Sequence, residues 1–276
     1  MPDVEALREP RRHPRASAII AASSRVAWAD LRTIYTPLTW TVGWLGRIVM
    51  QVVFYALIGT LLGDHRTFVF LFVGQAVMAC VMEVFMSIAS TTWERGAGTL
   101  PLLTAAPGSL WPVFVGRSLQ WLPSGAATAC VALFVVGPFL GVSWSLPTAP
   151  LAAAAVLLTG ASMYPFALTI AAYALRRPGW RNVLSSVAST VTMLICGVTV
   201  PLEFWPTWVH TLANALPITH GLDAVRTLQS VTITGSALPQ LGWTALSGIA
   251  WFAIAVCAFN VFGAAGRRDG SIGFGD

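Results

Sequence analysis

Residues 94–107 read Glu-Arg-Gly-Ala-Gly-Thr-Leu-Pro-Leu-Leu-Thr-Ala-Ala-Pro and separate two long apolar runs. A segment this short cannot form a soluble domain, so we expect it to be a connector at one face of a membrane. It contains an acid–base pair, a Gly-x-Gly-Thr turn and a cluster of leucines. These features favour a surface on which another protein docks. The alternative is an ordinary polar turn whose charges only stop membrane insertion.

The composition of the whole chain also predicts a membrane protein. Of its 276 residues, 56% are hydrophobic and 10% are charged, whereas soluble domains have roughly 25% charged residues. The mean hydropathy is +0.71, and several apolar runs exceed the roughly 20 residues that cross a bilayer. We therefore predict an all-α polytopic membrane protein. We expect no signal peptide, because no apolar core with a small-residue cleavage site follows the basic N-terminal residues.

The apolar runs predict six spans joined by short connectors. They are residues 39–62, 68–89, 113–140, 151–174, 183–200 and 241–262. Pro123 and Pro165 are expected to kink or break the third and fourth spans. Residues 17–36 predict an amphipathic helix on the membrane surface, with a disordered basic tail as the alternative. The chain thus divides into a basic arm with an interfacial helix, residues 1–36, and a six-helix domain, residues 37–276.

The arginines predict the orientation of these spans. Loops on the cytoplasmic side of a membrane carry an excess of basic residues. With both termini in the cytoplasm, only Arg66 and Arg226 lie outside, and Arg47 lies within a span. The arginines then placed inside are Arg8, Arg11, Arg12, Arg15, Arg25, Arg32, Arg95, Arg117, Arg176, Arg177, Arg181, Arg267 and Arg268. We therefore expect residues 94–107 to be cytoplasmic and residues 201–239 to be extracytoplasmic.

The absence of lysine excludes two kinds of chemistry. All 16 basic residues are arginine, so this sequence has neither the lysine of a phosphate-binding P-loop nor one for a Schiff base. The basic pI of about 9.5 reflects arginines at membrane edges, so we expect no nucleic-acid partner. The four cysteines lie in apolar runs without metal or disulfide spacing and are expected to be buried. His210 and His220 lie ten residues apart with no carboxylate at metal spacing, which argues against a metal site.

Three polar residues lie inside the predicted spans. They are Arg47 and Gln51 in the first span and Glu83 in the second. Ionisable groups are costly in lipid, so Arg47 and Glu83 are expected to face protein, a cavity or a partner. One interpretation is a polar patch in a translocation route. The alternatives are a structural pair, which we favour, or an Arg47 side chain that extends to the cytoplasmic headgroups.

The segment of residues 201–239 is broken by prolines and rich in aromatic residues. It predicts two short helices, residues 207–215 and 220–230, that are too short to cross a membrane. We expect them to dip into the outer leaflet or cap it as a re-entrant segment. The residues we single out there are Trp205, Trp208, Pro217, His220 and Arg226.

Two motifs at matching places in this topology resemble the permease subunits of type-2 ABC exporters. Residues 94–107, followed by Gly116-Arg117, are similar to that family's acid, Gly-Thr-Leu, Leu-Leu, Pro and Gly-Arg pattern. Here Gly-Ala separates the charge pair from the Gly-Thr. Residues 216–226, Leu-Pro-Ile-Thr-His-Gly-Leu-Asp-Ala-Val-Arg, resemble the family's Leu-Pro and Ala-x-Arg segment before the last span.

The resemblance implies a transport subunit without catalytic residues of its own. In that family, the segment between spans two and three is a coupling helix that binds a separate ATP-binding subunit. Two copies of that subunit would bind ATP and Mg. A second permease copy, identical or different, would complete the translocation pathway. The complex would lie in the cell membrane, in contact with lipids. Efflux of an amphipathic cargo is implied: a drug-like natural product, a lipid or a lipid-linked glycan. The residues expected to dock the ATP-binding subunit are Glu94, Arg95, Gly98, Thr99, Leu100, Leu102, Leu103 and Pro107.

Two other classes of function remain open from the residues alone. A secondary transporter would show internal repeats and intramembrane acids for ion coupling, and only Glu83 is such an acid. A lipid-modifying membrane enzyme would need a nucleophile or paired acid and base residues at one depth, and none is found.

Overall fold

The computed structural model describes residues 15–34, 36–96, 98–105, 108–230 and 237–269. These residues form helices, and no strand occurs among them. Five helical segments in the described part are long and apolar enough to cross a membrane. They are Thr39–Leu61, His65–Thr91, Trp111–Phe139, Thr148–Ala174 and Leu238–Ala265.

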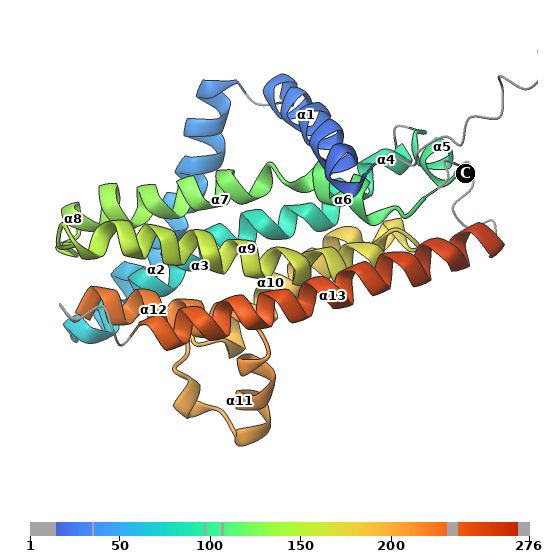
Figure 1. Cartoon of the computed structure of the whole chain (residues 1–276). Helices are drawn as coiled ribbons and strands as arrows, with labels where there is room; N and C mark the ends of the chain where they lie inside the picture. The colour runs from blue at the N-terminus through green and yellow to red at the C-terminus, as the bar shows by residue number, and fades with distance from the viewer. Residues whose placement is uncertain (1–14, 35, 97, 106–107, 231–236, 270–276) are drawn as a thin grey trace, which may run out of the picture.

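The helix α3, His65–Thr91, is the centre of the bundle (Figure 1). It is apolar around its whole circumference, which is typical of a helix buried on every side. Helices α2 (Gly46–Leu61), α7 (Trp121–Cys130), α9 (Thr148–Ala174) and α10 (Arg181–Ile195) all pack against it. The Asp64 carboxylate caps its N-terminus by accepting the amide hydrogens of Arg66 and Thr67, at 3.0 and 3.2 Å. The hydrogen bond from the Arg66 amide is the main reason that the pKa of Asp64 lies below its ordinary value.

The first and third spans are irregular helices. The first joins a π-helical turn, η2 (Thr39–Leu45), to α2. The third consists of α6 (Trp111–Ser118), α7, a π-helical turn η3 (Val131–Val136) and α8 (Gly137–Phe139). Its interruption falls at Leu119, four residues before Pro123, because proline has no amide hydrogen to donate to that carbonyl. The Leu119 oxygen accepts from the amide of Leu122 instead, at 3.2 Å. The predicted break is therefore present, whereas α9 continues through Pro165 as one helix.

The prediction of a fifth span over residues 183–200 was wrong, because the helix found there is shorter. The helix α10 has 15 residues and ends at Ile195, which is too short to cross a bilayer of the usual thickness. Gly197 has φ of +77°, a left-handed backbone that stops the helix. The chain then runs against α3 at Gly74, where the missing side chain leaves room for the carbonyl group of Val198.

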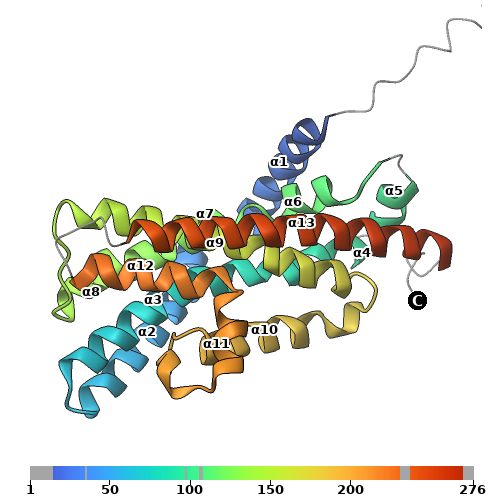
Figure 2. The same cartoon turned by 60° about the horizontal axis from the view of Figure 1, so that its bottom comes forward.

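The two short helices predicted before the last span are present as α11 (Thr207–Asn214) and α12 (Pro217–Ser230). Their surroundings differ: α11 projects from the bundle (Figure 1), while α12 lies beside α13, Leu238–Asp269 (Figure 2). The helix α12 also packs on α9 and α3, and most of its apolar side chains are buried. It is therefore part of the bundle and not only a cap on it.

Residues 17–36 were predicted to be a surface helix, and α1 occupies Ala16–Ile34. It packs on α6, at the end of the bundle where α4 and α5 lie (Figure 1). The helices α4 (Trp93–Gly96) and α5 (Leu100–Ala105) form the connector between the second and third spans.

Candidate functional site

We call the connector of residues 94–107 the docking segment. Its described residues include the end of α4, a turn at Gly98 and the short helix α5. Gly98 has φ of +70°, and the amide of Thr99 donates to the carbonyl oxygen of Glu94 at 3.0 Å. This is the hydrogen bond of a Schellman motif, in which glycine takes the left-handed position after a helix. The Gly-x-Gly-Thr pattern therefore ends α4 at Gly96, and α5 begins at Leu100, two residues after the turn glycine Gly98.

Glu94 points into the protein. It is buried, and its carboxylate accepts hydrogen bonds from the Thr99 hydroxyl and from Nε of Arg117. Arg117 lies on α6, and its Nη1 donates to the Asp30 carboxylate of α1 at 2.7 Å. One guanidinium group thus joins the docking segment to the surface helix α1. Charge-assisted hydrogen bonds of this kind are stronger than neutral ones and hold their partners in a defined geometry.

This connection was not predicted from the sequence, in which Arg117 stands only as a cytoplasmic charge and a family motif residue and Asp30 is not singled out. One feature of the sequence could have indicated a partner for Asp30: it is the lone acidic residue among the 19 of α1.

The three leucines of the docking segment do not form a common exposed cluster, so that expectation was wrong. Leu100 is 1% exposed and lies with Leu110 and Phe259 around a small cavity at this end of the bundle. Leu103 is partly buried, and Leu102 is 70% exposed. The physical reason is the helix itself: residues three apart share a face, while Leu102 lies on another. Arg95 lies within α4, and Pro107 lies outside the described residues.

Within the described residues, Arg47 and Glu83 lie near enough to interact electrostatically but form no ion pair. Glu83 is fully buried in α3 and accepts a hydrogen bond from the Thr128 hydroxyl of α7. Arg47 is exposed on α2, and its guanidinium carbon lies 5.0 Å from the ring centroid of Trp44. In the part of the chain that the structure describes, both ion pairs are formed by Arg117, so Arg47 and Glu83 are not bonded to each other. Gln51 donates to the Gln75 side chain at 3.4 Å.

A charge exchange tests whether Arg47 and Glu83 act as a pair. We expect the double variant Arg47→Glu, Glu83→Arg to be no more stable than either single variant, because Glu83 is held by the Thr128 hydroxyl and Arg47 lies on an exposed face. The midpoint of thermal unfolding in detergent would be the measurement. Recovery in the double variant would contradict the arrangement seen here, and Glu83→Gln is the control that keeps a hydrogen-bond acceptor for Thr128.

The residues predicted for the outer segment hold its helices together. His220 lies between α11 and α13, with Nδ1 3.2 Å from Oε1 of Gln240 and Nε2 3.1 Å from the carbonyl oxygen of Asn214. Arg226 donates to the carbonyl oxygen of Phe70 at 3.0 Å, and its guanidinium carbon lies 3.7 Å from the centroid of the Phe70 ring. Both residues therefore have structural contacts. Pro217 is buried at the start of α12, Trp205 is partly buried, and Trp208 is exposed on α11.

Cysteine and metal chemistry has little support in the described residues. Cys80 and Cys196 are buried as expected, and Cys130 is partly buried. Cys257 is exposed because it lies on an uncovered face of α13, which corrects the expectation that all four are buried. Across the described ranges, no cluster of three or more histidine, cysteine or acidic side chains is suited to hold a metal ion.

Comparisons with known proteins agree with this architecture. The sequence pattern of the ABC-2 type transporter family matches residues 36–230, which include the docking segment and α12. The chain is 26% identical over 198 residues to a probable multidrug ABC transporter permease, YbhR, of Escherichia coli strain K12, and equally to its counterpart in strain O157:H7. The alignment covers 65% of this chain and 50% of each relative. The chain therefore spans about half the length of the curated relatives it matches.

Proposed function

Because the chain belongs to the ABC-2 type transporter family, we propose that it is the membrane-spanning permease subunit of an ATP-driven exporter. Its docking segment receives a separate ATP-binding subunit, two copies of which bind ATP and Mg and hydrolyse the nucleotide. The sequence contains no lysine, so the nucleotide-binding P-loop belongs to that partner. Both termini face the cytoplasm, because α10 starts beside Thr92 at one end of α3 and α12 reaches Phe70 near the other end, so that together they return the chain across the membrane before α13. The α11–α12 region is then a re-entrant segment that opens to the outer side.

The observation that carries the proposal is the construction of the docking segment. Its base is held by the buried Glu94 carboxylate and by Leu100 in the apolar core. Its outer face presents the exposed Leu102. A rigid support with one protruding apolar side chain suits insertion into a groove, because a preorganised surface loses little conformational freedom on binding.

The exposed Arg47 supports a second permease copy. It lies one position inside α2, well within a predicted span, and a cation there is costly when it faces lipid. A second copy, identical or different, would cover it or enclose it in a water-filled pathway between the two chains. The pathway would then carry an amphipathic cargo, such as a drug-like natural product, a lipid or a lipid-linked glycan. Export of a drug would contribute to antibiotic resistance.

Purification of the whole complex tests the proposal. The gently solubilised permease should retain a distinct P-loop ATPase and raise its rate of ATP hydrolysis. Cargo movement by the isolated chain under an ion gradient alone would instead indicate a secondary transporter. Turnover of a lipid substrate without ATP would indicate a membrane enzyme.

Leu102 gives a more local test of docking. Leu102→Arg is expected to weaken binding of the ATP-binding subunit about tenfold or more, because it would place an unpaired charge where an apolar side chain inserts, and tenfold corresponds to about 1.4 kcal/mol. Titration of the purified subunits would measure the affinity. Leu146→Arg is the matched control, since Leu146 is 94% exposed in the segment between α8 and α9. Equal affinities for the two variants would exclude Leu102 from the interface.

A further inference from the structure

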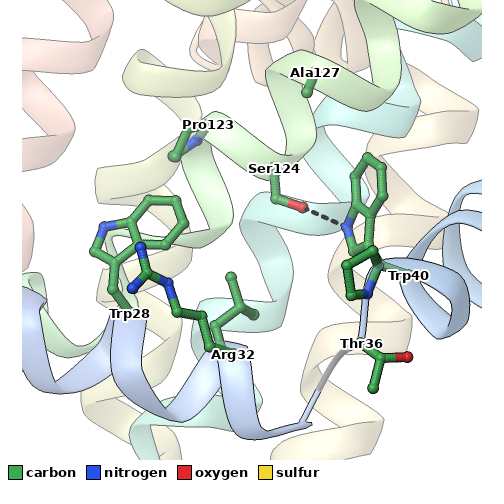
Figure 3. A pocket seen from close by; sticks show the side chains of 9 residues that line it. Trp28, Arg32, Thr36, Trp40, Pro123, Ser124 and Ala127 are labelled. Carbon is green, nitrogen blue, oxygen red and sulfur yellow. Dashed lines mark hydrogen bonds between the residues drawn. The ribbon is translucent and has the colours of Figure 1, made fainter.

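A cavity of about 600 Å³ lies between the surface helix, the first span and the third span. Figure 3 shows Trp28 and Arg32 on one side, Trp40 on the other and a wall formed by α7. Its volume lies within the roughly 300–1,000 Å³ of typical small-molecule sites. The lining residues are Trp28, Leu31, Arg32, Thr36, Pro37, Trp40, Pro123, Ser124 and Ala127.

The cavity has an unneutralised positive charge. Arg32 is its one ionisable lining residue, and no carboxylate lines it among the described side chains. Within those same residues, neither ion pair involves Arg32. Asp30, two residues earlier on α1, is already bonded to Arg117. A ligand with a negative group would therefore complement the charge of this cavity.

The remaining lining is suited to a membrane interface. Trp28 and Trp40 have the amphipathic rings that concentrate at headgroup depth. Trp40 is held in place by its Nε1, which donates to the Ser124 hydroxyl at 3.4 Å. Leu31, Pro123 and Ala127 add apolar surface. An arginine and two hydroxyl groups, together with aromatic and apolar side chains, match a molecule that has an anionic head and hydrocarbon chains.

We propose that this cavity binds an anionic phospholipid of the cytoplasmic leaflet, with its phosphate on Arg32 and its upper acyl chain against the two tryptophans. That leaflet is the one rich in acidic lipids, which attract arginine near the surface. The proposal requires α1 to lie at the membrane surface, as its sequence predicts. It does not require the chain to be an exporter, so its failure would leave the proposed function standing.

Lipid titration of the purified permease, followed by native mass spectrometry, tests the charge requirement. The probes are phosphatidylglycerol and phosphatidylcholine with the same acyl chains. Wild-type protein should bind phosphatidylglycerol more tightly. Arg32→Gln should weaken that binding about fivefold, the effect of one arginine near a charged surface. Arg25→Gln is the control, because Arg25 lies on the same helix but does not line the cavity.

Two further measurements locate the lipid and keep the proposal testable if the Arg32→Gln variant does not fold. Arg32→Lys should keep the preference for phosphatidylglycerol. Brominated phosphatidylglycerol should quench tryptophan fluorescence less in Trp28→Phe than in wild-type protein, and this holds even if Arg32→Gln fails to fold. Equal binding of the two lipids by wild-type protein would overturn the proposal and favour an uncharged amphipathic ligand. Unchanged phosphatidylglycerol binding in a folded Arg32→Gln variant would overturn it as well.

Discussion

Replacement of Glu94 by alanine is expected to reduce permease-stimulated ATP hydrolysis tenfold or more while the protein remains inserted and soluble in detergent. The Glu94 carboxylate accepts hydrogen bonds from Thr99 in the docking segment and from Arg117 on α6. Without it, the turn at Gly98 loses one of its supports. Arg117 is 19% exposed and would lose its more buried partner. Breaking a buried ion pair from one side typically costs about 3–5 kcal/mol, which here would loosen the docking segment rather than the bundle.

The other partner of Arg117 provides the matched control. Asp30 is 44% exposed, and exposed ion pairs contribute only about 0–1 kcal/mol. Asp30→Asn should therefore change ATP hydrolysis less than about fivefold. Arg117→Met should resemble Glu94→Ala, because it removes the same connection from the opposite side. Full stimulation by a well-expressed Glu94→Ala variant would show that the docking segment does not depend on this ion pair.

Gly74→Ala is expected to lower the thermal stability of the purified permease by roughly 1–3 kcal/mol, the usual cost of inserting a methyl group into a packed core. A Cβ atom at this position would overlap the carbonyl oxygen of Val198 and lie 3.0 Å from Nη2 of Arg226. The first of these is backbone, so it cannot move away as a flexible side chain would. The substitution would push the end of the α10 region and α12 away from α3.

Gly43→Ala is the control for this prediction. Gly43 lies in η2 and has no atom within 4 Å of an added Cβ, so it should be as stable as the wild type or slightly more stable. The midpoint of thermal unfolding in detergent would measure both variants. A Gly74→Ala variant as stable as Gly43→Ala would mean that the contact between α3 and Val198 adjusts without cost.

Much of the helical architecture was predictable from local sequence. Five of the six apolar segments, the N-terminal helix α1 and the two short helices before the last span were placed near their observed bounds. Lipid favours such segments strongly, because a helix satisfies every backbone hydrogen bond within itself. The turn at Gly98 was equally local, since it depends on one glycine and a hydrogen bond across five residues.

The fifth span shows where local reasoning fails. Residues 183–200 are apolar enough to predict one helix, yet the helix ends at Ile195. Gly197 has a left-handed backbone, and the missing side chain of Gly74 leaves room for the Val198 carbonyl group against α3. Gly74 is more than 100 residues away along the sequence. The pattern of apolar residues in 183–200 therefore cannot show that this segment packs against it.

The sequence by itself determined that this protein is a bundle of membrane helices with a polar connector between the second and third spans, and that these 276 residues contain no P-loop lysine. The hydrophobicity and length of each segment are sufficient for those conclusions, because both can be read from neighbouring residues without knowing which distant segments come into contact. Only the tertiary structure decided that Glu94 and Leu100 point inward while Leu102 points out. It also decided that Arg117 bonds to Glu94 and Asp30, which are 23 and 87 residues away. Such choices depend on which distant groups the packed helices bring within hydrogen-bonding distance.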